Sequence, residues 1–217
     1  AFYKIYNCTT LFEDIADIRS GVMSGDDERF IRLWHEIDFE KFDCYCSNVD
    51  ESIAHKTKWF PVTRGGQYRK WYGNLENVIN LYNGGYEIEY ENFKNHRLRD
   101  PKYYFKEGVT WTMITSYKLS VRYVPQGVLF GNGGPTCFFT VNTKLYLAIL
   151  NSKVAEYIIG VVNPSLNTVV SDICGIPIKK SEQNQKIIIM SDKCLEFSHL
   201  DWDAYETSWD FNRHPLI

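Results

Sequence analysis

The chain has 217 residues, of which 44% are hydrophobic and 24% charged, a composition that excludes a disordered or collagen-like protein. A chain of this length buries roughly 70% of its unfolded surface and does not depend on disulfides or metal ions to fold. The longest apolar run, residues 158–162, contains a glycine and is far shorter than the ~20 residues of a transmembrane helix. Ala1 begins no signal or transit peptide pattern, and the initiator methionine is absent. We therefore expect a cytoplasmic domain cut from a longer polypeptide, without membrane contact.

The net charge of −3 is distributed unevenly along the chain. Residues 52–122 contain twelve Lys and Arg against six Asp and Glu, a balance of +6, while the rest of the chain has twelve against 21, a balance of −9. An anionic partner is attracted to the basic part. The alternative is a solvated basic face that binds nothing.

In chain order, residues 11–37 are predicted to form two strands joined by a turn at 24–27, where Ser, Gly and two Asp provide turn chemistry. Residues 38–58 are polar and aromatic, which indicates a loop or a short helix. The strand predicted at 59–62 then enters the loop 64–70, which contains two glycines.

A strand predicted at 78–81 is followed by Asn83-Gly84-Gly85, which indicates a β-hairpin. Three more strands are predicted at 118–124, 128–130 and 136–141. Apolar residues then recur at intervals of three and four, which predicts one helix over 143–161. Asn163-Pro164 ends this helix, because the residue before a proline disfavours helical geometry.

The last elements predicted are a strand at 173–178 and helices at about 181–197 and 199–207. Together these elements predict the α+β class, with a mostly antiparallel sheet, one long helix and C-terminal helices. We expect a main domain over residues 1–180 and a helical extension over 181–217.

No catalytic or metal site is predicted. Cys44 and Cys46 are expected on a strand, facing the same side, but no second Cys/His pair accompanies them at zinc-ligand spacing. The glycines at 131–134 precede a proline and a strand, which indicates a turn and not a phosphate-binding loop. Residues 163–166 (Asn-Pro-Ser-Leu) miss the N-P-P-[YF] motif of amino-methyltransferases, because Leu166 cannot stack on a flipped base. Catalysis by this chain alone is therefore not expected.

Cations and aromatic residues alternate over 58–72 and again over 93–106, a pattern that favours nucleic-acid binding. Arg, Asn and Gln side chains form bidentate hydrogen bonds with base edges in the major groove, and glycines allow close approach of the backbone. The candidates for base reading are Arg64, Gln67, Arg69, Lys70 and Asn132. The candidates for phosphate contacts are Lys56, Lys58, Lys94, Arg97, Arg99, Lys118 and Arg122. Trp59, Phe105 and Trp111 are instead expected in the core.

Five blocks of the sequence resemble the PglX-type methyltransferases of BREX phage-defence systems. They include KWFPVTRGGQYRKWYG at 58–73 and SWDFNRHPL at 208–216, and the others lie at 17–37, 108–127 and 150–159. In that family the matching segment follows the catalytic domain and acts as the target-recognition domain, a role that the resemblance assigns to residues 1–180. The chain is also similar to the specificity modules of type I and type IIG restriction–modification enzymes. The S-adenosylmethionine glycines and the N-P-P-Y motif of the family have no counterpart in this chain.

The resemblance implies a domain that recognises a short duplex DNA sequence for an adenine-specific, S-adenosylmethionine-dependent methyltransferase. Its partners would be double-stranded DNA and an upstream methyltransferase domain, with the cofactor bound in the parent enzyme and none in this chain. An alternative parent is a type IIG or type I restriction–modification enzyme. An alternative of another class is a protein-interaction module that docks other defence-complex subunits or a DNA-mimicking phage inhibitor.

Overall fold

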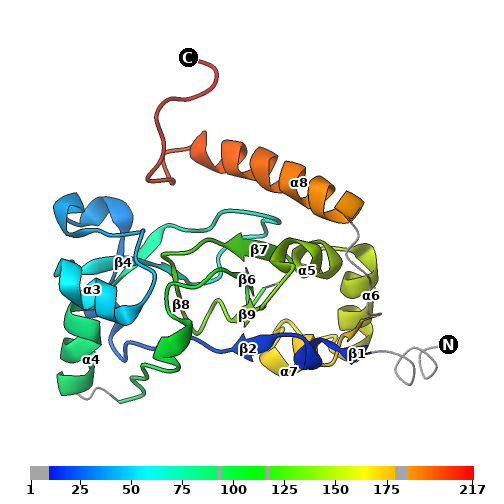
Figure 1. Cartoon of the computed structure of the whole chain (residues 1–217), viewed down its shortest axis with the longest axis horizontal. Helices are drawn as coiled ribbons and strands as arrows, with labels where there is room; N and C mark the ends of the chain where they lie inside the picture. Colours follow the sequence, from blue (N-terminus) through cyan, green and yellow to red (C-terminus); the bar gives the residue numbers. More distant parts are fainter. Residues whose placement is uncertain (1–9, 92–93, 116–117, 179–184) are drawn as a thin grey trace.

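The computed structural model describes residues 10–91, 94–115, 118–178 and 185–217. In this part of the chain two four-stranded sheets lie side by side, joined by the segment that runs from β7 to β9 (Figure 1). The first sheet has the order β2–β9–β6–β7, formed by Asp17–Arg19 (β2), Thr136–Phe138 (β9), Gly108–Trp111 (β6) and Val121–Val124 (β7). The second has the order β3–β5–β4–β8, formed by Ile31–Leu33 (β3), Asn77–Asn80 (β5), Trp59–Thr63 (β4) and Leu129–Phe130 (β8). A two-stranded ribbon joins Thr10–Leu11 (β1) to Pro177–Ile178 (β10).

The strand pairs are antiparallel except for β4 and β8, which are parallel. The α-helices of the described residues are Asp27–Phe30 (α2), Val49–His55 (α3), Tyr86–Glu91 (α4), Thr143–Leu150 (α5), Lys153–Val162 (α6), Val170–Cys174 (α7) and Gln185–Asp203 (α8). Short 3₁₀ turns lie at Phe12–Asp14, Trp34–Glu36, Phe39–Lys41, Tyr82–Gly85 and Pro101–Tyr103. The α+β class and the mostly antiparallel pairing are confirmed.

Each sheet has its own core. The first sheet packs its apolar side chains against α5, α6 and α7, around Trp111, whose indole Nε1 donates to the Thr168 carbonyl oxygen at 2.8 Å. The second sheet packs against α4 and the aromatic residues that precede β6, around Phe60 and Phe105. Phe105 and Trp111 are fully buried as predicted, and Trp59 is half-buried.

The helix predicted over 143–161 is two helices, α5 and α6, which meet at an angle of 61°. The break lies at Asn151, whose side chain accepts a hydrogen bond from the Val121 amide at 3.1 Å and donates to the Val121 carbonyl at 2.9 Å. Ser152 then begins α6 by accepting a hydrogen bond from the Ala155 amide. Among the described residues no single helix is long and apolar enough to span a membrane, and α5 with α6 reaches that length only across this bend.

Several other local predictions are wrong. Asn83 and Gly84 adopt left-handed conformations that lead into α4, and β5 pairs with β3 and β4, so no hairpin forms at this turn. Cys44 and Cys46 lie in an irregular loop instead of on a strand. Residues 170–174 form α7, which leaves only Pro177–Ile178 of the strand predicted there.

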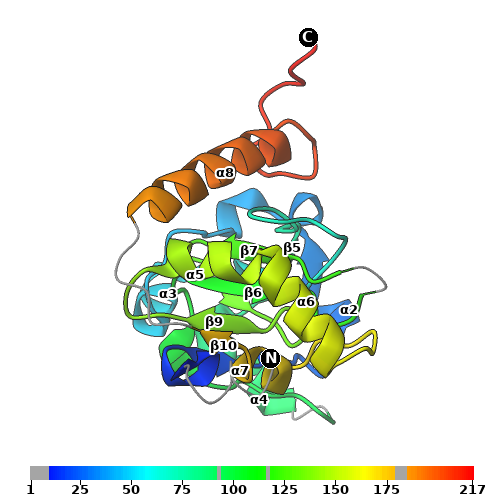
Figure 2. The same ribbon diagram turned by 90° about the vertical axis from the view of Figure 1, so that its right-hand side faces the viewer.

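At the C-terminus one helix, α8, replaces the two predicted, and residues 181–184 lie outside the described residues. α8 lies over α5 and β7 (Figure 2). Its Trp202 is buried in a small cluster with Tyr72, Leu75, Val124 and Val128. The helix therefore closes the side of the molecule that carries the 64–73 loop.

Replacing Gly73 with alanine is expected to lower the free energy of unfolding by about 1–3 kcal/mol. Gly73 has φ +113°, and a Cβ atom there would lie 2.5 Å from Arg69 Cδ and 2.8 Å from Trp202 Cε3, so the loop and α8 would have to separate. Chemical denaturation measures the effect. Gly160→Ala is the matched control, because this exposed glycine of α6 has open space around its Cβ position. An unchanged midpoint for Gly73→Ala would mean that α8 packs independently of the main domain.

Candidate nucleic-acid interface

A groove of about 560 Å³ brings together three of the predicted DNA-binding residues. Arg64 follows β4, Lys94 follows α4, and Asn132 lies in the loop between β8 and β9. Because β4 and β8 are parallel neighbours, the loops that follow them leave the sheet at the same edge. Residues 64 and 132, far apart in the sequence, therefore share one groove.

The groove is fixed by backbone contacts. The Gly131 amide donates to the Thr63 carbonyl at 2.9 Å, and the Asn132 amide donates to the Val22 carbonyl at 3.1 Å. A Cβ atom at Gly133 would lie 2.7 Å from the Arg64 carbonyl oxygen, so only glycine allows this approach. The turn predicted at 131–134 therefore holds Asn132 beside Arg64.

The lining of the groove is also tied to the basic segment 94–106. Met23 and Arg97 exchange two backbone hydrogen bonds, of 3.0 and 2.7 Å. Met23 and Lys94 both line the groove. The pairing places the start of the basic segment at the rim.

All three cations of the 64–70 loop are bound within the protein. Arg64 pairs with Asp27 at 2.6 Å, and Arg69 pairs with Asp201 of α8 at 2.7 Å while lying over the Trp202 ring. The Lys70 Nζ donates to the Asn151 carbonyl oxygen at 3.0 Å. A base would have to displace Asp27 or Asp201 to reach either arginine.

Gln67 differs from its neighbours in this loop. Its side chain is exposed and makes no hydrogen bond to the described residues, while its backbone carbonyl accepts from Asn74 Nδ2 at 2.8 Å. The loop therefore holds the backbone of Gln67 and leaves the side-chain amide available to a partner.

Arg122 was expected to contact phosphate, and this prediction is wrong. Its side chain is 1% exposed and donates to the Thr112 hydroxyl at 3.0 Å, the Arg69 carbonyl at 3.2 Å and the Gly65 carbonyl at 3.4 Å. Burial lowers the pKa of Arg122 to about 10. Apolar alternation along β7 suggested an outward side chain, but the 64–73 loop covers that face of the strand. Arg122 supports the loop from inside the protein.

The remaining phosphate candidates fall into two groups. Lys118 is exposed but pairs with Glu156 at 2.8 Å, and this hydrogen bond holds the pKa of Glu156 below its ordinary value. Lys56, exposed, ends α3 in a left-handed conformation, and Lys58 lies over the Trp59 ring.

The second group lies in the segment 94–106, whose lysines and arginines form no ion pair with any described residue, while His96 lies 3.8 Å from Glu89. Lys94 and Arg97 are exposed and Arg99 is half-buried. Lys102 and Lys106 are exposed and lie over the Tyr103 ring at 4.9 and 5.9 Å. We call the five side chains Lys94, Arg97, Arg99, Lys102 and Lys106 the unpaired basic stripe. Phosphates bound there would displace no carboxylate of the described residues.

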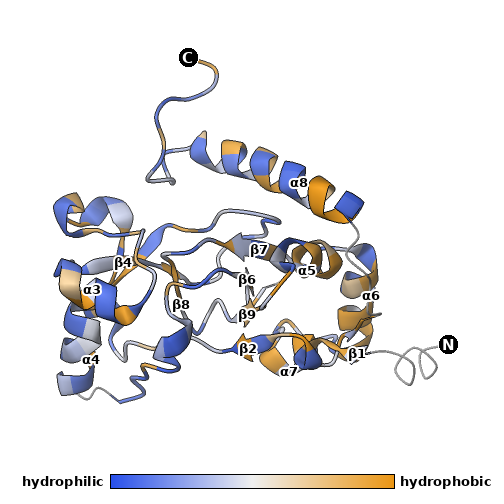
Figure 3. Cartoon of the chain, viewed as in Figure 1, coloured by the Kyte–Doolittle hydropathy of each residue, from blue (hydrophilic) through white to orange (hydrophobic). Residues whose placement is uncertain are grey.

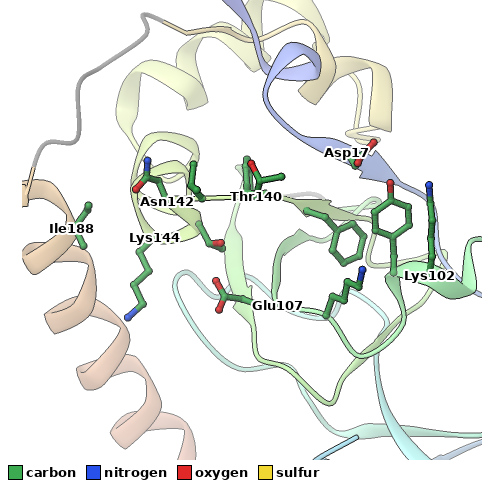
Figure 4. Close-up of a pocket in the computed structure, with 13 residues that line it drawn as sticks. Asp17, Lys102, Glu107, Thr140, Asn142, Lys144 and Ile188 are labelled. Atoms are coloured by element: carbon green, nitrogen blue, oxygen red, sulfur yellow. The ribbon is translucent and has the colours of Figure 1, made fainter. Parts of the chain in front are cut away.

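The stripe ends at a second cavity, of about 800 Å³, between β9 and the start of α5. Figure 4 shows Asp17 and Lys102 at one end, Lys144 and Ile188 of α8 at the other, and Glu107 between them. Lys144 pairs with Asp192 of α8, and a hydrogen bond from Tyr103 lowers the pKa of Asp17. None of the base-reading candidates lines this cavity, so the first groove remains the candidate site for sequence reading.

Two features of this surface were not among the candidate site residues. Asp27, at the start of α2, lines the groove and pairs with Arg64, and Lys102 and Lys106, expected only as members of a basic group, continue the stripe. The local charge balance contained the signal for the lysines. No local signal exists for the Asp27 contact, which joins residues 37 positions apart.

No protein-family model matches the chain. Two curated relatives match nearly its whole length, and both are adenine-specific methyltransferases, so the chain is homologous to one segment of enzymes of this class. The first is BrxX of Escherichia coli O9:H4 (strain HS), 36% identical over 198 residues, which are 89% of this chain and 15% of the relative. The second is PglX of Lacticaseibacillus casei (strain Zhang), 32% identical over 212 residues, which are 94% of this chain and 17% of the relative. The resemblance to the PglX type is thereby confirmed, and the chain spans less than a fifth of these relatives.

Proposed function

We propose that the chain is the DNA target-recognition domain of an S-adenosylmethionine-dependent, adenine-specific methyltransferase of BREX phage defence, acting in the cytoplasm. The observation that carries the proposal is the groove that unites Arg64, Lys94 and Asn132 at one end of the unpaired basic stripe. In this proposal an upstream methyltransferase domain binds the cofactor and transfers the methyl group. This chain selects the duplex sequence and binds no S-adenosylmethionine.

In this proposal the groove contacts the bases and the unpaired basic stripe contacts the phosphates. Asn132 has the side-chain amide that pairs with the N6 and N7 edge of adenine, and Gln67 offers the same chemistry outside the groove. Arg64 offers a guanidinium for guanine when it leaves Asp27. The cations of the stripe hold phosphates, which orients the duplex without reading its sequence.

Binding of labelled duplexes of different sequence tests the proposal directly. We expect one family of sequences to be retained at salt concentrations that release the others. Equal affinity for all duplexes would contradict base reading, and absence of binding to any duplex would contradict the proposed partner.

Replacing Asn132 with alanine is expected to relax specificity at one base position by roughly 5- to 150-fold, because a bidentate contact discriminates by about 1–3 kcal/mol. Gln67→Ala is expected to act at a different position. Affinities for single-base variants of the selected site measure both effects. Asn212→Ala, at an exposed asparagine near the C-terminus, is the matched control. Uniform weakening across all variants would reassign the changed residue to phosphate binding.

The same domain can also belong to a type IIG or type I restriction–modification enzyme, which duplex binding does not distinguish.

The interaction-module alternative is favoured by one observation. α8 exposes Ile189, Met190, Phe197 and Leu200 at 48–69% of their surface, and hydrophobic positions recur along the helix in Figure 3. Exposed apolar side chains of this kind mark protein contacts. We infer that they contact other domains of the parent enzyme or other subunits of the defence complex. Loss of complex assembly without loss of duplex binding, on replacing Phe197 and Leu200 with serine, would support this assignment.

A further inference from the structure

Three side chains with different donor atoms converge next to α3. Asp43 and Cys46 lie in the loop that precedes the helix, and His55 is its last residue. Asp43 Oδ2 lies 2.8 Å from His55 Nδ1 and 3.2 Å from Cys46 Sγ, and Cys46 Sγ lies 3.7 Å from His55 Nδ1. The three donor atoms are therefore close enough together to contact one ion.

These separations lie within about 0.5 Å of those in a tetrahedral zinc site. Bonds of about 2.0 Å to nitrogen and oxygen and 2.3 Å to sulfur, at tetrahedral angles, place the donor atoms about 3.3–3.6 Å apart. The observed separations bracket this range, and small side-chain rotations would complete the match. Thiolate, imidazole and carboxylate are the ligand set that zinc uses in proteins.

The arrangement does not fit a nucleophile with its general base. A general base accepts the thiol proton on one ring nitrogen and is oriented through the other. In this cluster the same nitrogen, His55 Nδ1, faces both Asp43 and Cys46, and the other, Nε2, lies 3.9 Å from Glu51, too far for a hydrogen bond. Cys46 is also fully buried, so a substrate cannot reach its sulfur.

Hydrogen bonds and close packing hold the loop that carries Asp43 and Cys46 in place before any metal binds. Asp43 Oδ1 accepts from the Tyr45 amide at 2.8 Å, and the Asn48 side chain caps α3 by accepting from the Glu51 amide at 2.9 Å. The Cys44 carbonyl packs so closely on Gly127 that a Cβ atom there would lie 1.8 Å from its oxygen. His55 is 44% exposed and the Asp43 side chain only 11%, which leaves the histidine side open to solvent.

We propose that Asp43, Cys46 and His55 bind one zinc ion, with a water molecule as the fourth ligand. The ion replaces the thiol proton of Cys46, which is released to solvent, and bonds to the neutral imidazole at Nδ1 and to the carboxylate. Without metal, burial and the neighbouring Asp43 raise the pKa of Cys46 to about 12, so the thiol keeps its proton and donates to the carboxylate. Bound zinc joins the loop to the end of α3 and stabilises this corner of the second sheet.

Cobalt(II) is the probe, because it takes tetrahedral zinc sites and gives a thiolate-to-metal charge-transfer band. The whole chain, freed of metal by a chelator, is titrated with cobalt(II) under reducing conditions. We expect a charge-transfer band that saturates at one ion per chain and is bleached by zinc. Cys46→Ser and His55→Gln are expected to abolish the band, and Cys44→Ser is the matched control that keeps it.

Two results would overturn the proposal. One is folded wild-type protein without the band, which would leave the cluster as an Asp–His ion pair with a hydrogen-bonded thiol. The other is a band that survives Cys46→Ser and disappears with Cys44→Ser, which would move the site to another thiol. Circular dichroism of each variant without metal shows that loss of the band is not loss of fold.

Discussion

Replacing Arg122 with alanine is expected to lower the free energy of unfolding by about 3 kcal/mol or more. The change removes the donors to Gly65, Arg69 and Thr112, and each buried acceptor left without a partner costs about 1–3 kcal/mol. Removal of a buried charge offsets part of this loss, and the cavity left behind adds to it. Urea unfolding measures the change.

Two further variants define the role of this arginine. Arg122→Lys keeps the charge but cannot donate to acceptors on several sides, so it is also expected to destabilise the protein. Lys94→Ala, at an exposed cation, is expected to stay within about 0.5 kcal/mol of the wild type. Wild-type stability of Arg122→Ala, together with a loss of duplex affinity, would restore the original prediction that Arg122 contacts DNA.

Neutralising the unpaired basic stripe is expected to change duplex binding more than any other surface substitution. The quadruple alanine variant replaces Lys94, Arg97, Lys102 and Lys106. A plot of the logarithm of the binding constant against the logarithm of the salt concentration has a negative slope. If each of the four cations holds a phosphate, this slope becomes shallower by about 3.6, from roughly 0.9 per contact. Between 50 and 200 mM salt the ratio of wild-type to variant affinity then falls by about 150-fold.

The control for this variant must remove the same charge elsewhere. Four exposed lysines outside the stripe serve this purpose: Lys41, Lys153, Lys186 and Lys193. Lys118→Ala is expected to change the slope less than Lys94→Ala, because Glu156 already neutralises Lys118. Equal slopes for the two quadruple variants would show that net charge, and not this surface, governs the affinity.

Local patterns in the sequence predicted those elements whose geometry depends on neighbouring residues. β4, β5 and the helical periodicity of α5 and α6 are of this kind. The break between the two helices could not be predicted, because it depends on a pairing of Asn151 with Val121, 30 positions away. Asn83-Gly84 does not distinguish the two outcomes, because left-handed residues serve a hairpin and a helix entry equally well.

The candidate site shows the same division. The charge balance identified the basic region, and the resemblance identified the class of enzyme. Which cations are available depends on contacts between distant residues, such as Arg69 with Asp201, 132 positions apart. Arg122 is buried for the same reason, because the 64–73 loop, which is distant in the sequence, covers the face of β7 that carries its side chain.

The close packing of the glycine loop on Thr63 and Arg64 limits how the specificity of this domain can be redesigned or diversified. Gly131, Gly133 and Gly134 each face backbone or side-chain atoms of residues 63–65 at less than 3 Å from a Cβ position, so neither loop can be exchanged without the other. Grafting one loop from a homologue would leave two mismatched backbones in contact. Substitution of the side chains at 64, 67 and 132 leaves this frame intact. New recognition sequences are therefore more readily obtained by point changes, or by moving both loops as one cassette, than by transplanting a single loop.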